Sequence, residues 1–208
     1  MGDLIGKSVK RVEDNRFIKG EGKYTDDFNM DKQTYAIYVR SPHAHANIKG
    51  VNTSKAEAIE GVVKVFTGKD IADAGIVGSI CGWQVDFKNG DTMKEPGHPI
   101  MVSDKVRHVG DAVALVIAED RQTARDAAGL VEVDYEVLDA VVDPKAATKD
   151  GAPLVHDDVP NNIIFDWELG NKEETDAAFE KAHHITELSY HNQKLIPNAI
   201  EPRAALGH

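Results

Sequence analysis

The sequence predicts an α/β or α+β domain, and three neighbouring segments carry this prediction. Apolar residues run without a break from Ala112 to Ala118, which is typical of a strand buried on both faces of a sheet. A helix is expected next, because Asp120 is a suitable N-cap and Gly129 a suitable end. Apolar residues then alternate between positions 131 and 137, as in a second strand. This β-α-β unit would be right-handed if its two strands were parallel in one sheet.

The segments before this unit show the same mixture of strands and a helix. Ser54 is the expected cap of a short helix, with Glu57 at the capping-box position and Gly61 as its end. Residues 75–97 are rich in glycine and predict a long loop, for which a surface excursion is favoured over a functional role. Strands are expected in "TYAIYVRS", "ANIKGVNTS" and "VVKVFTGKD", the last of them broken by Gly68.

Proline and charge patterns divide the chain into four parts. Residues 1–18 are charged and predict an extended arm, and residues 19–143 hold the α/β elements. Three prolines and Gly151 between positions 144 and 160 predict a linker. Residues 161–208 would form a further region. It contains a helix capped by Asn171, a strand in "HHITELSYHNQ" and the start of another strand at positions 204–208.

The composition limits which kinds of binding partner are expected and in which cellular compartment the protein is expected. A net charge of −11 argues against nucleic acid or an anionic membrane surface as a partner. The one cysteine, Cys81, excludes an intramolecular disulfide and a cysteine metal cage. We expect no signal peptide and no membrane-spanning segment, because no apolar run is long enough. A cytoplasmic location is therefore predicted.

Few residues are candidates for chemistry. Glu201 and Arg203 stand among apolar residues in "IPNAIEPRAAL", which favours a partly buried ion pair or hydrogen-bond anchor over a catalytic role. Cys81 is expected to be a buried small residue rather than a reactive thiol. The remaining candidates are histidines, for which ordinary hydrogen bonding is favoured over a metal site. They are His43 and His45, expected on one face of a strand, and His183, His184 and His191.

Taken in order, several segments resemble one family. "GKSVKRVEDNRFIKGEGKYTDDF", "YVRSPHAHANI", "VRHVGDAVALVIAEDRQTARDAAGLVEVDYEVLDAVVDP" and "PNAIEPRAA" are similar to the large subunits of the molybdenum hydroxylases. This group includes aerobic carbon monoxide dehydrogenase, xanthine dehydrogenase and aldehyde oxidoreductases. The resemblance extends over nearly the whole chain and is strongest to the carbon monoxide dehydrogenase-like and aldehyde dehydrogenase-like branches.

The resemblance implies a fold and an activity for the complete protein. Residues 19–143 would be an α/β-hammerhead domain, and residues 161–208 would begin the first molybdenum-cofactor-binding domain. A molybdenum–pterin cytosine dinucleotide cofactor would oxidise a small substrate with water as the source of oxygen. Electrons would pass to an iron–sulfur subunit and to an FAD subunit of the same complex.

The resemblance assigns no catalytic, cofactor-binding or metal-ligating residue to this chain. Glu201 and Arg203 match a family motif and would frame a pocket or serve the structure. The chain is therefore expected to be an inactive, cofactor-free fragment, whether its end reflects an engineered boundary, proteolysis or a split gene. The alternatives are a non-catalytic docking or assembly module and, more remotely, an independent ligand- or metal-binding protein. The segment after Pro153 is expected to be poorly anchored or paired abnormally, and its unpaired edges would favour a homo-oligomer.

Overall fold

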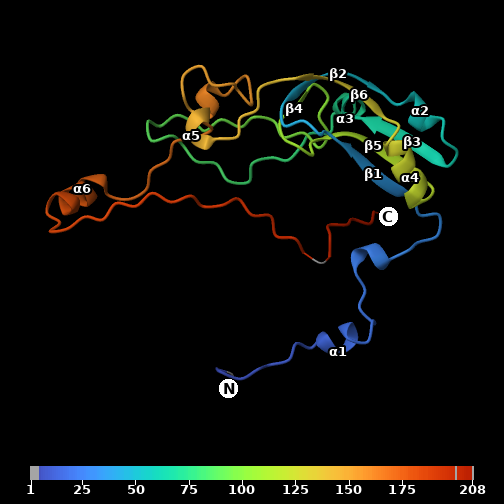
Figure 1. The fold of residues 1–208 in the computed structure, drawn as a ribbon, viewed down its shortest axis with the longest axis horizontal. Coiled ribbons are helices and arrows are strands. Elements are labelled where there is room, and N and C mark those ends of the chain that lie inside the picture. The colour runs from blue at the N-terminus through green and yellow to red at the C-terminus, as the bar shows by residue number, and fades with distance from the viewer. Residues whose placement is uncertain (1–4, 200, 208) are drawn as a thin grey trace. The chain divides into compact units, whose positions relative to one another are not determined.

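The computed structural model describes residues 5–199 and 201–207 (Figure 1). Residues 34–185 form one compact unit, and the described parts of residues 1–33 and 186–208 form a second unit. The first four residues of the expected arm and the last residue of the expected terminal strand lie outside the described residues. No helix among the described residues is long and apolar enough to cross a membrane.

The larger unit contains two three-stranded sheets, and every strand pair in them is antiparallel. Sheet A has β5 (Ala112–Ala118) between β1 (Tyr35–Arg40) and β3 (Val62–Thr67). Sheet B has β2 (Ala46–Asn52) between β4 (Lys105–Val106) and β6 (Glu132–Val137). The odd-numbered strands thus belong to sheet A and the even-numbered strands to sheet B.

The expected strand, helix and strand at positions 112–137 are confirmed as β5, α4 (Arg121–Ala128) and β6. A shared parallel sheet is not formed, because β5 and β6 lie in different sheets. Each strand instead pairs with partners that lie far from it in the sequence, such as Ala46 with Val137. The handedness rule for parallel crossovers therefore does not apply here.

The continuous apolar run of β5 is explained by two core clusters on its opposite faces. Val113 packs with Ala46 and Val106 of sheet B. Val116, three residues along the strand and so on the other face, packs with Ala56 and Ala127 from the helices. Strand β5 is therefore buried on both sides, as its sequence predicts.

Two helices lie over the outer face of sheet A, near β1, β3 and β5 in Figure 1. In α4, the Asp120 side chain accepts hydrogen bonds from the backbone N–H groups of Gln122 and Thr123, so the expected cap is confirmed. In α2 (Ser54–Glu57) the cap prediction is wrong. The N-cap is Thr53 without a side-chain bond, and the Asn52 side chain accepts a hydrogen bond from the Ser54 N–H.

Gly68 begins α3 (Gly68–Asp73), where β3 ends as expected. Its backbone lies so close to a neighbouring segment that a Cβ at this position would meet the Val102 carbonyl oxygen at 2.1 Å. Residues 74–104 then form the expected long loop, which holds only isolated bridges such as Ser79 with His98.

The expected linker is anchored to the larger unit. It begins with α5 (Pro144–Ala147), and Ala147 and Val159 are buried. Asn162, in the 3-10 helix η2 (Pro160–Asn162), donates hydrogen bonds to the carbonyls of Ala147 and Pro153, each at 2.9 Å. Its Oδ1 accepts a third from the Val155 N–H at 2.8 Å. The expectation of weak anchoring after Pro153 is therefore wrong for residues 153–162.

Helix α6 (Lys172–Glu180) begins at Asn171, whose side chain accepts a hydrogen bond from the Glu174 N–H as expected. The strand expected at positions 183–193 is not formed, and no residue described between 183 and 207 lies in a strand. Its apolar side chains are exposed, including Leu188 and Tyr190. Alternating residues form a strand only when a partner strand supplies the hydrogen bonds.

The smaller unit holds little regular structure. Its N-terminal part contains α1 (Asp14–Phe17) and the 3-10 helix η1 (Thr25–Asp27). Neither element has a buried residue. Within the described residues 5–18, the predicted arm contains the single turn of α1 and otherwise no helix or strand.

Candidate functional site

Glu201 and Arg203 do not form the expected partly buried ion pair. Both are exposed, and the salt bridges of the described part of the chain do not join them. Glu201 instead accepts a hydrogen bond through Oε1 from the Thr25 backbone N–H at 3.3 Å. This contact ties the last described segment of the smaller unit to its first segment.

The histidines do not converge on a metal site. His45 precedes β2 and is buried, and its Nδ1 donates a hydrogen bond to the Asp139 carbonyl at 2.8 Å. The His43 ring packs edge-on against Tyr135, with 5.0 Å between the ring centroids. Within the described ranges, no group of three or more His, Cys, Asp or Glu residues could hold a metal ion. His45 therefore fits the favoured interpretation, a hydrogen-bonded structural histidine.

A polar cluster joins sheet B to the anchored segment at positions 153–162. The Lys105 ammonium group donates to both carboxylate oxygens of Asp157, at 2.8 and 3.0 Å. This contact lowers the pKa of the Asp157 carboxyl. Burial, and then the nearby Arg107 guanidinium, lower the pKa of His156. Both effects disfavour the imidazolium form of His156.

Sequence reasoning missed this cluster because its members come from separate segments. Lys105 and Asp157 stand 52 residues apart and carry no shared motif. The only local signal is the His-Asp-Asp run at positions 156–158, which composition alone places in a linker.

Cys81 is exposed, so the expectation of a buried small residue is wrong. Its thiol donates to the Trp83 carbonyl oxygen at 2.8 Å. The residue lies in the long loop, where no hydrophobic core is available to cover it.

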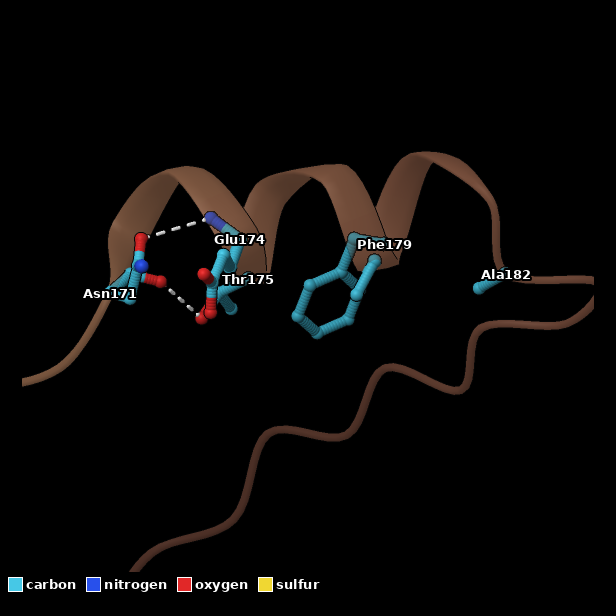
Figure 2. A pocket seen from close by; sticks show the side chains of 6 residues that line it. Asn171, Glu174, Thr175, Phe179 and Ala182 are labelled. Carbon is cyan, nitrogen blue, oxygen red and sulfur yellow. Dashed lines mark hydrogen bonds between the residues drawn. The ribbon is translucent and has the colours of Figure 1, made fainter.

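A shallow hollow runs along one side of α6, lined by Asn171, Glu174, Thr175, Ala178, Phe179 and Ala182 (Figure 2). Two of its polar residues, Asn171 and Thr175, form hydrogen bonds at the start of the helix. Asn171 accepts from the Glu174 N–H through its side chain and from the Thr175 hydroxyl through its carbonyl. Figure 2 shows the Phe179 ring beside them, with no side chain of another element drawn opposite. The hollow is open and offers no convergent polar groups for a ligand.

The molybdenum–pterin cofactor implied by the sequence resemblance does not fit the residues described here. A bound cofactor needs an enclosed site with a few convergent polar groups. The hollow on α6 lacks such groups, and the described residues provide no cluster of metal ligands.

Comparison with known proteins shows the family. The profile of "Aldehyde oxidase and xanthine dehydrogenase, a/b hammerhead domain" matches residues 19–139. The carbon monoxide dehydrogenase large chain of Afipia carboxidovorans is 36% identical over 209 residues, which cover 95% of this chain and 24% of that protein. The nicotine 6-hydroxylase large subunit of Paenarthrobacter nicotinovorans is 37% identical over 98% of this chain and 24% of its own length.

Solved structures agree with the sequence comparison. A crystal structure of Cu,Mo-CO dehydrogenase in the carbon monoxide-reduced state has a TM-score of 0.69 at 38% identity, covering 86% of this chain and 23% of that one. Quinoline 2-oxidoreductase from Pseudomonas putida 86 has a TM-score of 0.60 at 33% identity, covering 73% and 19% of the two chains. The chain thus spans about a quarter of the length of these two curated relatives, the carbon monoxide dehydrogenase large chain and the nicotine 6-hydroxylase large subunit. It belongs to the aldehyde oxidase and xanthine dehydrogenase family and is homologous to part of the large subunit of carbon monoxide dehydrogenase-like molybdenum hydroxylases.

Proposed function

We propose that this chain is the N-terminal scaffold of a molybdenum hydroxylase large subunit. The complete protein oxidises a small substrate, such as carbon monoxide or an aldehyde, with water as the source of oxygen. The observation that carries the proposal is the match to the carbon monoxide dehydrogenase large chain over 95% of this chain. This chain also resembles part of the corresponding solved enzyme, with a TM-score of 0.69 over 86% of this chain.

In this proposal, residues 1–208 help to position the other parts of the large subunit and do not supply its catalytic groups. Residues 19–143 form the hammerhead domain, 144–160 connect it to the next domain, and 161–208 begin the first cofactor-binding domain. The molybdenum–pterin cytosine dinucleotide and the catalytic groups are contributed by the rest of the large subunit. Glu201 and Arg203 frame that later domain, and Glu201 already contacts the Thr25 backbone in this chain.

The proposed partners are an iron–sulfur subunit and an FAD subunit, which receive the electrons in turn. The proposed compartment is the cytoplasm. A single cysteine, which excludes an intramolecular disulfide, is compatible with a reducing environment.

Metal analysis with an activity assay tests this proposal. Purified residues 1–208 are expected to carry no stoichiometric molybdenum and to reduce no dye with carbon monoxide or an aldehyde. A longer chain that contains the remainder of the large subunit, co-expressed with its partner subunits, is expected to do both. Stoichiometric molybdenum in residues 1–208 would contradict the scaffold role.

The reading frame after codon 208 separates the scaffold from the docking module. Continuation into glycine-rich loops and a late glutamate motif supports the scaffold. A stop codon there, with no genes for partner subunits nearby, would instead support an independent docking module.

A further inference from the structure

An acidic aromatic surface lies on the larger unit and is called here the tryptophan patch. It consists of residues 83–95 and 163–169, which are joined by hydrogen bonds from the Lys88 N–H to the Asp166 carbonyl and from the Lys94 N–H to the Ile164 carbonyl, each at 2.8 Å. The rings of Trp83 and Trp167 meet edge to face with 6.2 Å between their centroids. Trp83 remains 69% exposed and Trp167 47% exposed, so this aromatic pair is not part of the core.

The charge of the tryptophan patch is negative. Its two segments contain five acidic and two basic side chains. One of the basic side chains, Lys88, is held by Asp166 at 2.8 Å, and this hydrogen bond raises the pKa of Lys88. Glu168 adds to the negative charge around that ammonium group. The patch therefore combines two exposed indole faces with an excess of carboxylates, which suits a partner with cationic and apolar side chains.

The same chain contains a segment of this chemistry. Residues 6–23 carry six basic and three acidic side chains, although the whole chain has a net charge of −11. Val9, Val12 and Ile18 are 62%, 94% and 81% exposed. Apart from the single turn of α1 and the turn that follows it, where the Glu21 N–H donates to the Arg16 carbonyl, this basic segment has no helix or strand.

We propose that the basic segment of one copy of this chain docks on the tryptophan patch of a second copy. Lysine and arginine side chains of the segment lie over the indole faces and beside the patch carboxylates, and its valines and isoleucine cover the apolar parts. Since every copy has one segment and one patch, two copies exchange segments symmetrically and satisfy both contacts at once. The second contact is then intramolecular within the dimer, which strengthens the pair beyond either contact alone. This inference does not rest on the proposed enzymatic role.

A charge-swap experiment in the full 208-residue chain tests the exchange. The segment variant is Lys7→Glu/Lys10→Glu, and the patch variant is Glu95→Lys/Glu168→Lys. At low salt, sedimentation is expected to show dimers of the wild-type chain at submillimolar concentration, and the dissociation constant should rise with added salt because the contacts are exposed. Each variant alone places like charges opposite each other, so its dissociation constant should rise about tenfold or more.

When the two variants are mixed, the now acidic segment of the first faces the now basic patch of the second. Opposite charges therefore meet only between chains of different variants. The equimolar mixture is therefore expected to form heterodimers at low salt. The matched control Glu57→Lys/Glu60→Lys makes the same charge change at two exposed positions, the last residue of α2 and a residue of the following turn, and should dimerise as the wild type does. Circular dichroism and thermal melting establish that all the variants are folded.

Three outcomes would overturn the proposal. The wild-type chain could be monomeric at low salt, which would mean that the patch binds nothing on a second copy. Either variant could dimerise as well as the wild type, which would place any dimer contact elsewhere. Finally, the mixed variants could stay monomeric, as expected if the segment binds only within its own chain or the patch serves a different protein.

Discussion

The Lys105 ammonium group lies 2.8 Å from the Asp157 carboxylate and links strand β4 to the segment that follows α5. The two ends of this salt bridge differ in their surroundings. The Lys105 side chain is only 13% exposed, whereas that of Asp157 is 78% exposed. A cation in so covered a position depends on its carboxylate partner, because an unpaired buried charge is costly.

Stability should therefore depend on the ionisation of Asp157. The salt bridge lowers the pKa of Asp157 in the folded state, so its contribution is complete above the unfolded-state value of about 3.9. That contribution is lost as the pH falls through the lower folded-state pKa. We expect Asp157→Asn to reduce the free energy of unfolding at neutral pH, and this difference from the wild type should shrink toward zero at acidic pH.

Urea unfolding of the wild type and the variant at several pH values measures this difference. Asp150→Asn is the control, since it removes an exposed carboxylate from the same region. A difference for Asp157→Asn that does not change with pH would contradict the assignment.

Asn162 should be a strong determinant of stability in the expected linker. Asn162→Ala removes three hydrogen bonds, two donated and one accepted. We expect a loss of about 2–3 kcal/mol, at about 1 kcal/mol for each bond. Asn161→Ala is a matched control, because Asn161 has a similar positive φ of 53° against 55° for Asn162. If the two variants lose equal stability in denaturant titrations, the backbone angle rather than the hydrogen bonds sets the cost.

Gly68 should not tolerate even alanine. A Cβ there would lie 2.1 Å from the Val102 carbonyl oxygen, so the backbone at the start of α3 would have to move. Overpacking of this kind costs about 1–3 kcal/mol, and more where rigid backbone is in the way. Gly50→Ala is the control, since a Cβ at Gly50 meets no atom within 4 Å and its cost should stay below about 1 kcal/mol. Thermal unfolding of both variants gives the comparison, and equal melting temperatures would show that the contact is not rigid.

Glu201→Ala should change the environment of one backbone group in the smaller unit. Removing the carboxylate deletes the acceptor of the Thr25 N–H, whereas Arg203→Ala leaves it in place. We expect a shift of the Thr25 amide resonance in the nitrogen–proton NMR spectrum of the first variant only. The change in stability should be within about 0.5 kcal/mol, because the contact is exposed. An unchanged Thr25 resonance in Glu201→Ala would show that the contact does not persist in solution.

The sequence predicted those strands and helices that depend on interactions between residues close together in the chain. The run from Ala112 to Ala118 and the cap at Asp120 are examples, because periodicity and capping act over a few residues. Sheet membership was not predictable in this way. Ala46 pairs with Val137 and Tyr35 with Ala118, and no nearby residues specify such long-range pairings.

The candidate site was less accessible to sequence reasoning. The apolar frame around Glu201 and Arg203 suggested burial, but apolar residues near a charge do not show what packs on them. The Thr25 N–H that Glu201 contacts lies 176 residues away. The tryptophan patch was equally hidden, because its rings come from a long loop and from the region before α6, neither of which has a periodic pattern.

The long loop divides residues 35–137 into two halves, with β1–β3 before it and β4–β6 after it. Both sheets contain strands from both halves. The half before the long loop supplies the outer strands of sheet A and the centre of sheet B, and the half after it supplies the reverse. Neither half can complete a sheet by itself, since each lacks the strand on which its own outer strands pair. A protease cut inside the loop would therefore sever the chain without releasing either piece. The two halves would stay together through the strand pairs that they share in both sheets, even after the loop is cut.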